Sequence, residues 1–137
     1  MNKTEMYAFI TKNPMGYMAT ADGNKPHVRG MGCFRADENG IIYFTSYPKN
    51  VCKQLLANPE TEVCYFAEGT QLRVSGRVEE LKDNAIKQAV VDKYPFLKPN
   101  IEKFGLDHMA IFRLKPVEAS TWSMQNMTGG ITPVDLS

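Results

Sequence analysis

The arrangement of apolar residues along the chain predicts a strand followed directly by a helix in its first half. Residues 41–45, Ile-Ile-Tyr-Phe-Thr, form an apolar, β-branched and aromatic run of strand length. From Asn50 to Leu56 the apolar residues recur at helical spacing instead. Pro48 suits the first position of this helix, where its missing N–H removes no hydrogen bond, and Asn58-Pro59 ends it. We expect the rest of the domain to be organised around this strand–helix unit.

Short strands joined by tight turns account for most of the remaining pattern. In residues 72–78 apolar and polar side chains alternate, so that Leu72, Val74 and Val78 share one face. By the same reasoning, further strands are expected at residues 15–20, 26–34, 61–67, 109–114 and 119–124, with turns at 21–25, 37–40 and 68–69.

Helical segments are expected before, between and after these strands. Thr4 can cap a first helix, and its apolar stripe is Met6, Phe9 and Ile10. Residues 83–94 predict a helix whose buried stripe is Ala85, Ile86, Ala89 and Val90, and residues 99–104 add one helical turn. Hairpin-connected strands with a few helices predict a mainly β fold, an antiparallel β-barrel with attached helices, in a single domain over residues 1–137.

Composition narrows the range of functions. The net charge of +1 argues against a broad nucleic-acid footprint. No apolar run approaches the ~20 residues that cross a bilayer, and no secretory segment opens the chain, so we expect a cytoplasmic protein without a membrane partner. The cysteines Cys33, Cys52 and Cys64 have no metal-type spacing, which predicts reduced thiols and no metal site.

Self-contained catalytic motifs are absent from the sequence. There is no GxSxG, HExxH, P-loop or GxGxxG. Neither His27 nor His108 lies at a catalytic spacing from a serine, cysteine or carboxylate, and His108 is expected to have a capping or surface role. If the chain is an enzyme, a cofactor must therefore supply the chemistry.

Positive side chains gather in the first half of the sequence. Lys49 and Lys53 lie four residues apart at the start of the expected helix, directly after the hydroxyls of Thr45 and Ser46. Together with the guanidinium of Arg29, these groups and the helix N-terminus could hold a phosphate. The alternative is an ordinary strand–helix joint with two solvated lysines.

The order of several short motifs resembles a known family. The motifs are Lys25-Pro-His-Val-Arg-Gly-Met31, an acidic Gly turn, Ile42-Tyr-Phe-Thr-Ser46, Lys49, Lys53-Gln54-Leu55 and Asn58-Pro59. Over about residues 15–81 the chain is similar to the flavin-binding split-barrel proteins of the pyridoxamine 5'-phosphate oxidase-like superfamily, and most to its short, general-stress-protein-like members. The resemblance implies a six-stranded antiparallel split β-barrel. It also implies a homodimer with FMN in two sites at the subunit interface.

Site residues follow from this resemblance position by position. Val28, Arg29, Gly30 and Met31 would line the flavin ring and ribityl chain, partly through backbone groups. Phe44, Thr45 and Ser46 would follow on the neighbouring strand, and Lys49 and Lys53 would complete a phosphate site with Arg29. Trp122 is the candidate contribution from the partner subunit; its alternative role is a core or dimer contact. No catalytic residue is identified.

The C-terminal segment departs from the true oxidase. The oxidase ends in an Arg-x-His element that grips its pyridoxal phosphate substrate, and residues 122–133 contain no counterpart. The resemblance therefore implies an FMN-dependent oxidoreductase that passes electrons from NAD(P)H to a small acceptor, and not pyridoxamine phosphate oxidation.

Two alternatives stay open. One is a non-catalytic barrel that stores or senses flavin, or holds a deazaflavin or a haem bound through His27 or His108. The other is a small nucleic-acid-binding barrel that stacks bases on Tyr43, Phe44 and Tyr65, which the near-neutral charge disfavours.

Overall fold

The computed structural model describes residues 1–137. Its strands are β1 (Met15–Asp22), β2 (Lys25–Asp37), β3 (Gly40–Ser46), β4 (Glu60–Ala67), β5 (Thr70–Leu81), β6 (Met109–Leu114), β7 (Glu118–Ser123) and β8 (Thr132–Pro133). Its α-helices are α1 (Lys3–Lys12), α2 (Asn50–Ala57), α3 (Asn84–Lys93) and α4 (Lys98–Phe104), with 3-10 turns η1 (Pro95–Leu97), η2 (Leu106–His108) and η3 (Met124–Asn126).

Most expected elements are confirmed, and the differences are at the ends of helices and strands and in one additional strand. Asn2, not Thr4, caps α1: its side chain accepts from the N–H of Glu5, and the Glu5 carboxylate accepts from the N–H of Asn2. The second helix begins at Asn50, with Lys49 as its N-cap, so Pro48 lies outside it. The short strand β8 was not expected.

Six antiparallel strands close into a barrel, as the resemblance implies. Their order is β4-β1-β2-β3-β6-β5, and pairing of β5 with β4 closes the ring. Strand β5 pairs with three strands: Thr70–Arg77 with β4, Thr70–Ser75 with β7 and Val78–Leu81 with β6. Gly76 lies at this change of partner, where an added Cβ would stand 3.0 Å from the backbone oxygen of Lys115. A side chain there would push the strands apart.

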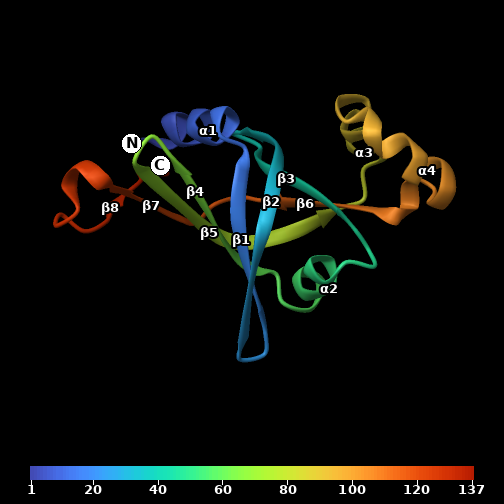
Figure 1. Cartoon of the computed structure of the whole chain (residues 1–137), viewed down its shortest axis with the longest axis horizontal. Helices are drawn as coiled ribbons and strands as arrows, with labels where there is room; N and C mark the ends of the chain where they lie inside the picture. Colours follow the sequence, from blue (N-terminus) through green and yellow to red (C-terminus); the bar gives the residue numbers. More distant parts are fainter.

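The barrel is split between β2 and β3. These strands pair only from Cys33–Tyr43 to Asp37–Gly40, across a bulge between Cys33 and Arg35. The N-terminal part of β2 pairs with β1 alone, and the β1–β2 hairpin projects below the barrel in Figure 1. Residues 26–32 therefore form an open strand edge, whose outward N–H and C=O groups make no backbone hydrogen bond to β3.

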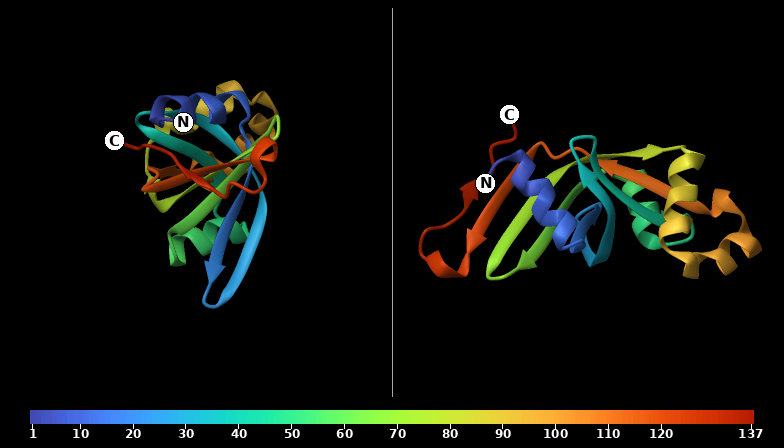
Figure 2. Two further views of the ribbon diagram at one scale, coloured as in Figure 1. Left: turned by 90° about the vertical axis from the view of Figure 1, so that its left-hand side faces the viewer. Right: turned by 90° about the horizontal axis from the view of Figure 1, so that it is seen from above.

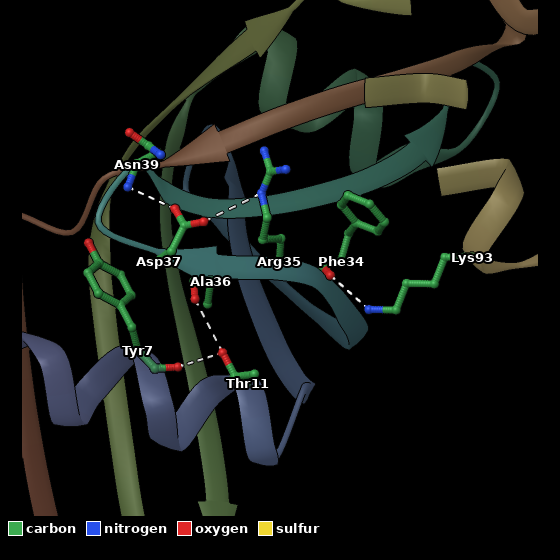
Figure 3. Close-up of polar contacts among 8 residues, drawn as sticks. All are labelled: Tyr7, Thr11, Phe34, Arg35, Ala36, Asp37, Asn39 and Lys93. Carbon is green, nitrogen blue, oxygen red and sulfur yellow. Dashed lines mark hydrogen bonds and ion pairs between the residues drawn. The ribbon is translucent and has the colours of Figure 1, made fainter. Parts of the chain in front are cut away.

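Alternating side chains of all six strands fill the barrel interior. Tyr43 of β3 and Tyr65 of β4 are fully buried there, with their hydroxyl oxygens 2.5 Å apart. Because both rings lie in the core, neither can stack a nucleobase. Helix α1 covers one end of the barrel with Met6 and Ile10. Thr11 ties α1 to β2 by donating to the carbonyl of Ala36, as Figure 3 shows.

Residues 84–108, comprising α3, η1, α4 and η2, form a helical arm at one end of the molecule (Figures 1 and 2). Val90 and Val91 of α3 pack on Ile42 and Ile111, on the outer face of β3 and β6. Of the stripe expected on α3, Val90 is buried, whereas Ala85 is exposed. At the end of α3, the ammonium of Lys93 donates to the carbonyl of Phe34, 3.0 Å away (Figure 3).

Candidate functional site

The open edge of β2 contains two glycines at positions where a side chain has room. A Cβ added at Gly30 would have only the Met15 sulfur within 4 Å, at 3.7 Å, and one at Gly32 only the Met15 methyl, at 3.9 Å. Packing inside the chain therefore does not require glycine at either position. A bare strand with unpaired peptide groups can receive a flat molecule against its backbone.

Arg29, on the same strand segment, has no acidic partner. Its guanidinium donates to the Met18 carbonyl at 3.1 Å, the Thr20 hydroxyl at 2.9 Å and Oε1 of Gln54 at 2.5 Å. All three acceptors are neutral. Burial lowers the pKa of Arg29, yet arginine stays protonated at any physiological pH.

The other four arginines each pair with a carboxylate. The pairs are Arg35–Asp37, Arg73–Glu62, Arg77–Glu60 and Arg113–Glu79. A partly buried cation without a counter-ion is unfavourable unless an anion reaches it. Arg29 is thus the arginine whose surroundings fit an anionic ligand.

Helix α2, which contacts Arg29 through Gln54, has an uncapped N-terminus. Its N-cap, Lys49, makes no side-chain capping bond, and no acidic residue lies in its first turn. The N–H groups of this turn carry a partial positive charge and attract anions. Gln54, which holds Arg29 of β2, is the fifth residue of α2, so the guanidinium is joined to the middle of this short helix.

The structure separates the two lysines that the sequence placed on one helix face. Lys53 lines an open groove of about 310 Å³ together with Gln54, Asn50 and Asp22. Lys49 instead lines a different, smaller cavity on the side of the helical arm. Lys49 and Lys53 therefore line two separate cavities.

The smaller cavity, the arm cavity, has a volume of about 130 Å³ and lies between the end of β3 and the helical arm. Its apolar wall consists of Phe44 and Met109 from the barrel and Leu97 and Ile101 from the arm. Its polar wall consists of Thr45, Ser46, Lys49, Asn100 and His108. None of these five side chains makes a hydrogen bond or ion pair within the chain, so they are free to bind a ligand.

The remaining predicted residues are spread over four places. Val28 is 69% exposed on the outer face of β2, whereas the side chain of Met31 belongs to the barrel core. The ring of Phe44 packs 5.5 Å from that of Tyr94 on the arm. Trp122 is half-buried on β7, opposite Gln71 of β5. Both views of the long axis place β7 at the far end of the molecule from the arm (Figures 1 and 2).

The outer face of β1, β2 and β4 carries several exposed apolar side chains. Tyr17 stands opposite Gly30 on one side and Cys64 on the other. The exposed apolar side chains of this outer face are Met15, Tyr17, Val28 and Phe66, and Glu60 and Glu62 of β4 lie on the same face. Exposed apolar side chains gathered in this way are typical of protein contacts.

Sequence reasoning missed three polar residues of the site. Gln54 appeared only as part of a motif, although it positions Arg29. Asn100 and His108 come from the arm, far from β3 in sequence, and no spacing rule connects them to it. His108, for which a capping or surface role was expected, is half-buried: it stacks on Phe104, with ring centres 4.7 Å apart, and lines the arm cavity.

No other class of site competes with this region. No group of three or more His, Cys, Asp or Glu side chains gathers where it could hold a metal. None of the helices is both long and apolar enough to cross a bilayer. The largest hollow, about 610 Å³, is an open groove between α1 and the β2–β3 turn, lined by residues such as Tyr7, Thr11 and Asp37 (Figure 3). It lies on a different part of the barrel from Arg29.

Known proteins share both the sequence pattern and the fold. Among solved structures, a NimC/NimA family protein from Clostridium acetobutylicum matches with a TM-score of 0.74 and 23% identity, over 90% of this chain and 88% of that one. A pyridoxamine 5'-phosphate oxidase-related, FMN-binding protein from Nostoc punctiforme matches with a TM-score of 0.67 and 15% identity, over 88% and 83% of the two chains. At these identities the likeness shows the fold.

A curated relative extends the match to sequence. The pyridoxine/pyridoxamine 5'-phosphate oxidase of Pseudomonas paraeruginosa is 36% identical over 63 residues, which are 44% of this chain and 29% of that protein. The match to the family described as pyridoxamine 5'-phosphate oxidase extends over residues 3–123. The chain, with its six-stranded split barrel, therefore belongs to the pyridoxamine 5'-phosphate oxidase family.

Proposed function

We propose that the chain binds FMN at the open edge of β2 and acts as a homodimeric oxidoreductase that passes electrons from NAD(P)H to a small acceptor. The observation that carries this proposal is Arg29, a partly buried guanidinium without a carboxylate, which lies on an unpaired strand edge and is bonded to Gln54 of α2, a helix without a side-chain N-cap. The FMN-binding relative with the same fold supports the choice of cofactor.

We place the phosphate of FMN against Arg29, Lys53 and the backbone N–H groups in the first turn of α2. Gln54, which accepts from Arg29, lines the same groove as Lys53. Bonds between a guanidinium and a phosphate are charge-assisted and are stronger than bonds between neutral groups. Asp22 also lines this groove, so the contribution of Arg29 must outweigh one nearby carboxylate.

We place the flavin ring of FMN along residues 28–32, where peptide groups are unpaired and Gly30 and Gly32 expose the backbone. When bound, FMN supplies a ring that accepts and releases hydride. The chain orients this ring through backbone hydrogen bonds, and its positive groups stabilise negative charge that develops on it. No side chain is assigned as a general acid or base.

A second copy of the chain completes the site in this proposal. The two hollows beside α2, of about 130 and 310 Å³, are at or below the lower end of the range for drug-sized ligands, so neither encloses a three-ring flavin alone. The outer face of Met15, Tyr17, Val28 and Phe66 offers a dimer contact beside the open edge. Trp122, distant from the arm in its own chain, could then contact the flavin of the partner. The three cysteines are unpaired, which fits a reducing, cytoplasmic location.

The test begins with the chromophore of the purified protein. We expect a yellow protein whose chromophore, released by denaturation, has the mass of FMN, and whose absorbance bleaches with NADH or NADPH without oxygen. Lys53→Ala should weaken FMN several-fold and leave riboflavin unaffected, because only FMN carries the phosphate. A Soret band would identify haem, and a protein that stays colourless in excess FMN would refute the proposal. Flavin that binds but resists both nicotinamides would indicate a non-catalytic binder.

A further inference from the structure

We infer that Tyr47 and Glu80 are positioning residues, which hold the loop between β3 and α2 in the conformation that receives the cofactor phosphate. This loop, residues 46–49, leads directly into the first turn of α2, where the proposed function places the phosphate. The inference rests on the proposed function for the identity of the ligand. The restraint of the loop rests only on contacts within the chain.

Glu80 interrupts the apolar pattern of its strand. The buried residues Val74 and Val78 of β5 face the core, and Glu80 is the next residue on that face. The side chain of Glu80 is only 17% exposed. A carboxylate in such a position is unfavourable unless it has hydrogen-bond partners. A charge that breaks the local pattern is expected where a strand has a role besides packing.

The Glu80 carboxylate has two partners within the chain. Tyr47 donates its hydroxyl proton to Oε2 of Glu80. The ammonium of Lys82 lies 3.3 Å from the same oxygen and donates to the Tyr47 hydroxyl at 3.1 Å. The hydrogen bond to Glu80 raises the pKa of Tyr47, so the phenol keeps its proton at neutral pH. We call these three residues the Tyr47 cluster.

The Tyr47 cluster joins the loop to both ends of the helical arm. Lys82 directly precedes Asp83, the N-cap of the first arm helix, α3. At the other end of the arm, the carbonyl of His108 accepts from the N–H of Tyr47 at 3.2 Å. The ring of Tyr47 packs against the main core cluster. Tyr47 is therefore restrained through its backbone, its ring and its hydroxyl.

This restraint extends along the backbone to the start of α2. The N–H of Lys49 donates to the carbonyl of Ser46 at 3.1 Å, and the N–H of Lys53 donates to the carbonyl of Lys49 at 3.2 Å. No side chain caps α2, so this hydrogen-bonded segment orders the free N–H groups at its start. A phosphate binds most tightly to donors that are already in place, and loss of the Tyr47 cluster should therefore weaken FMN binding.

Amide hydrogen exchange and flavin titration on the full chain test the inference. Glu80→Leu removes the acceptor of Tyr47. We expect faster exchange at the N–H groups of Tyr47 and Lys53, and FMN binding that is about tenfold weaker. Riboflavin, which has no phosphate, should be affected much less. Glu80→Gln keeps an acceptor oxygen for Tyr47 and should retain most of the FMN affinity.

The neighbouring residue Glu79 provides a matched control. Its carboxylate pairs with Arg113, and side chains alternate along a strand, so it lies on the opposite face of β5 from Glu80. Glu79→Leu should leave both the exchange rates of the loop and the FMN affinity unchanged.

Stability measurements separate positioning from a purely structural role. The double variant Tyr47→Phe/Glu80→Leu removes both polar groups together, so the midpoint of chemical denaturation of the flavin-free chain should change little. Its FMN affinity should nevertheless fall about as far as that of Glu80→Leu alone, because the two side chains act through one contact.

Three results would overturn the inference. One is unchanged exchange in Glu80→Leu, because other contacts would then order the loop. Another is faster exchange together with unchanged FMN affinity. The third is a large loss of stability in the double variant with equal losses for FMN and riboflavin. If the unmodified chain binds no flavin but Glu80→Leu still exchanges faster in the loop, the proposed function fails and the restraint of the loop stands.

Discussion

The guanidinium of Arg29 on β2 and the side-chain amide of Gln54 on α2 are hydrogen-bonded, 2.5 Å from Nη2 to Oε1. Thr20 of β1 donates to the same amide oxygen at 2.6 Å. Three elements that are separate in sequence thus fix one cation. This fixed cation, which lacks an acidic partner, is the central feature of the proposed cofactor site.

Replacement of Arg29 tests that role directly. Arg29→Ala should reduce FMN affinity by about 1.5–3 kcal/mol, the usual contribution of a hydrogen bond to a charged group, and should affect riboflavin much less. Gln54→Ala should also weaken FMN, because Arg29 keeps its charge but loses its orientation. Flavin fluorescence quenching measures both. Equal losses for FMN and riboflavin would show that the substitutions damage the fold and not a phosphate site.

Substitution of Gly30 should affect cofactor binding but not the stability of the fold. Because an added Cβ meets only the Met15 sulfur at 3.7 Å, Gly30→Ala should leave the free energy of unfolding within about 0.5 kcal/mol of the original value. The methyl group should still lower flavin affinity, by about 1–3 kcal/mol, if the ring lies against this strand. Chemical denaturation and flavin titration check the two effects.

Gly16→Ala is the matched contrast on the neighbouring strand. Its Cβ would stand 2.8 Å from the ring of Tyr65 and 2.9 Å from Val63 in the core. This variant should lose about 1–3 kcal/mol of stability through overpacking. If Gly30→Ala instead binds flavin with unchanged affinity, the flavin ring does not lie against Gly30 of β2.

The exposed outer face predicts how the subunits meet. Val28→Glu introduces a charge at a side chain that is 69% exposed in the single chain, so it should not unfold the barrel. It should convert a dimer to a monomer and reduce flavin binding, because a buried unpaired carboxylate is unfavourable in an interface. Light scattering coupled to gel filtration measures the change. Phe96→Glu, on the arm at 73% exposure, is the control and should stay dimeric.

The paired tyrosines of the core predict sensitivity to alkali. Burial raises the pKa of Tyr43 and of Tyr65 above the ordinary value of 10.0. The folded state therefore holds these protons more tightly than the unfolded state does. Their stabilising contribution is present below pH 10 and falls as the pH rises above it. Unfolding monitored by circular dichroism should show stability declining from about pH 10 upward.

Removal of both hydroxyls should reduce this sensitivity. Tyr65→Phe alone leaves the buried hydroxyl of Tyr43 without its partner and should cost about 1–3 kcal/mol at neutral pH. The double variant Tyr43→Phe/Tyr65→Phe removes both polar groups, so it should be nearly as stable as the original chain and should resist alkali better. An unchanged alkaline transition in the double variant would assign the effect to other groups.

Local sequence signals were sufficient for seven of the eight strands, and they drew attention to Arg29 in the candidate site. Alternation in residues 72–78 marked the faces of β5, and the motifs around Arg29 and Thr45 marked two neighbouring strands. Non-local packing decided the rest. Because α2 starts at Asn50, Lys49 precedes the helix and lines the arm cavity, whereas Lys53 lies within the helix and lines the groove beside Asp22. The spacing of four residues between the two lysines does not predict this separation. Asn100 and His108 reach β3 only because the arm folds back over the barrel.

The split between β2 and β3 also has a consequence for handling the protein. A strand edge with free peptide groups, beside an apolar face, is a template on which another chain can add a strand. Flavin and a correctly placed subunit would both shield that edge. Chains synthesised faster than the cofactor is supplied should therefore aggregate, and adding riboflavin to the growth medium should raise the soluble yield.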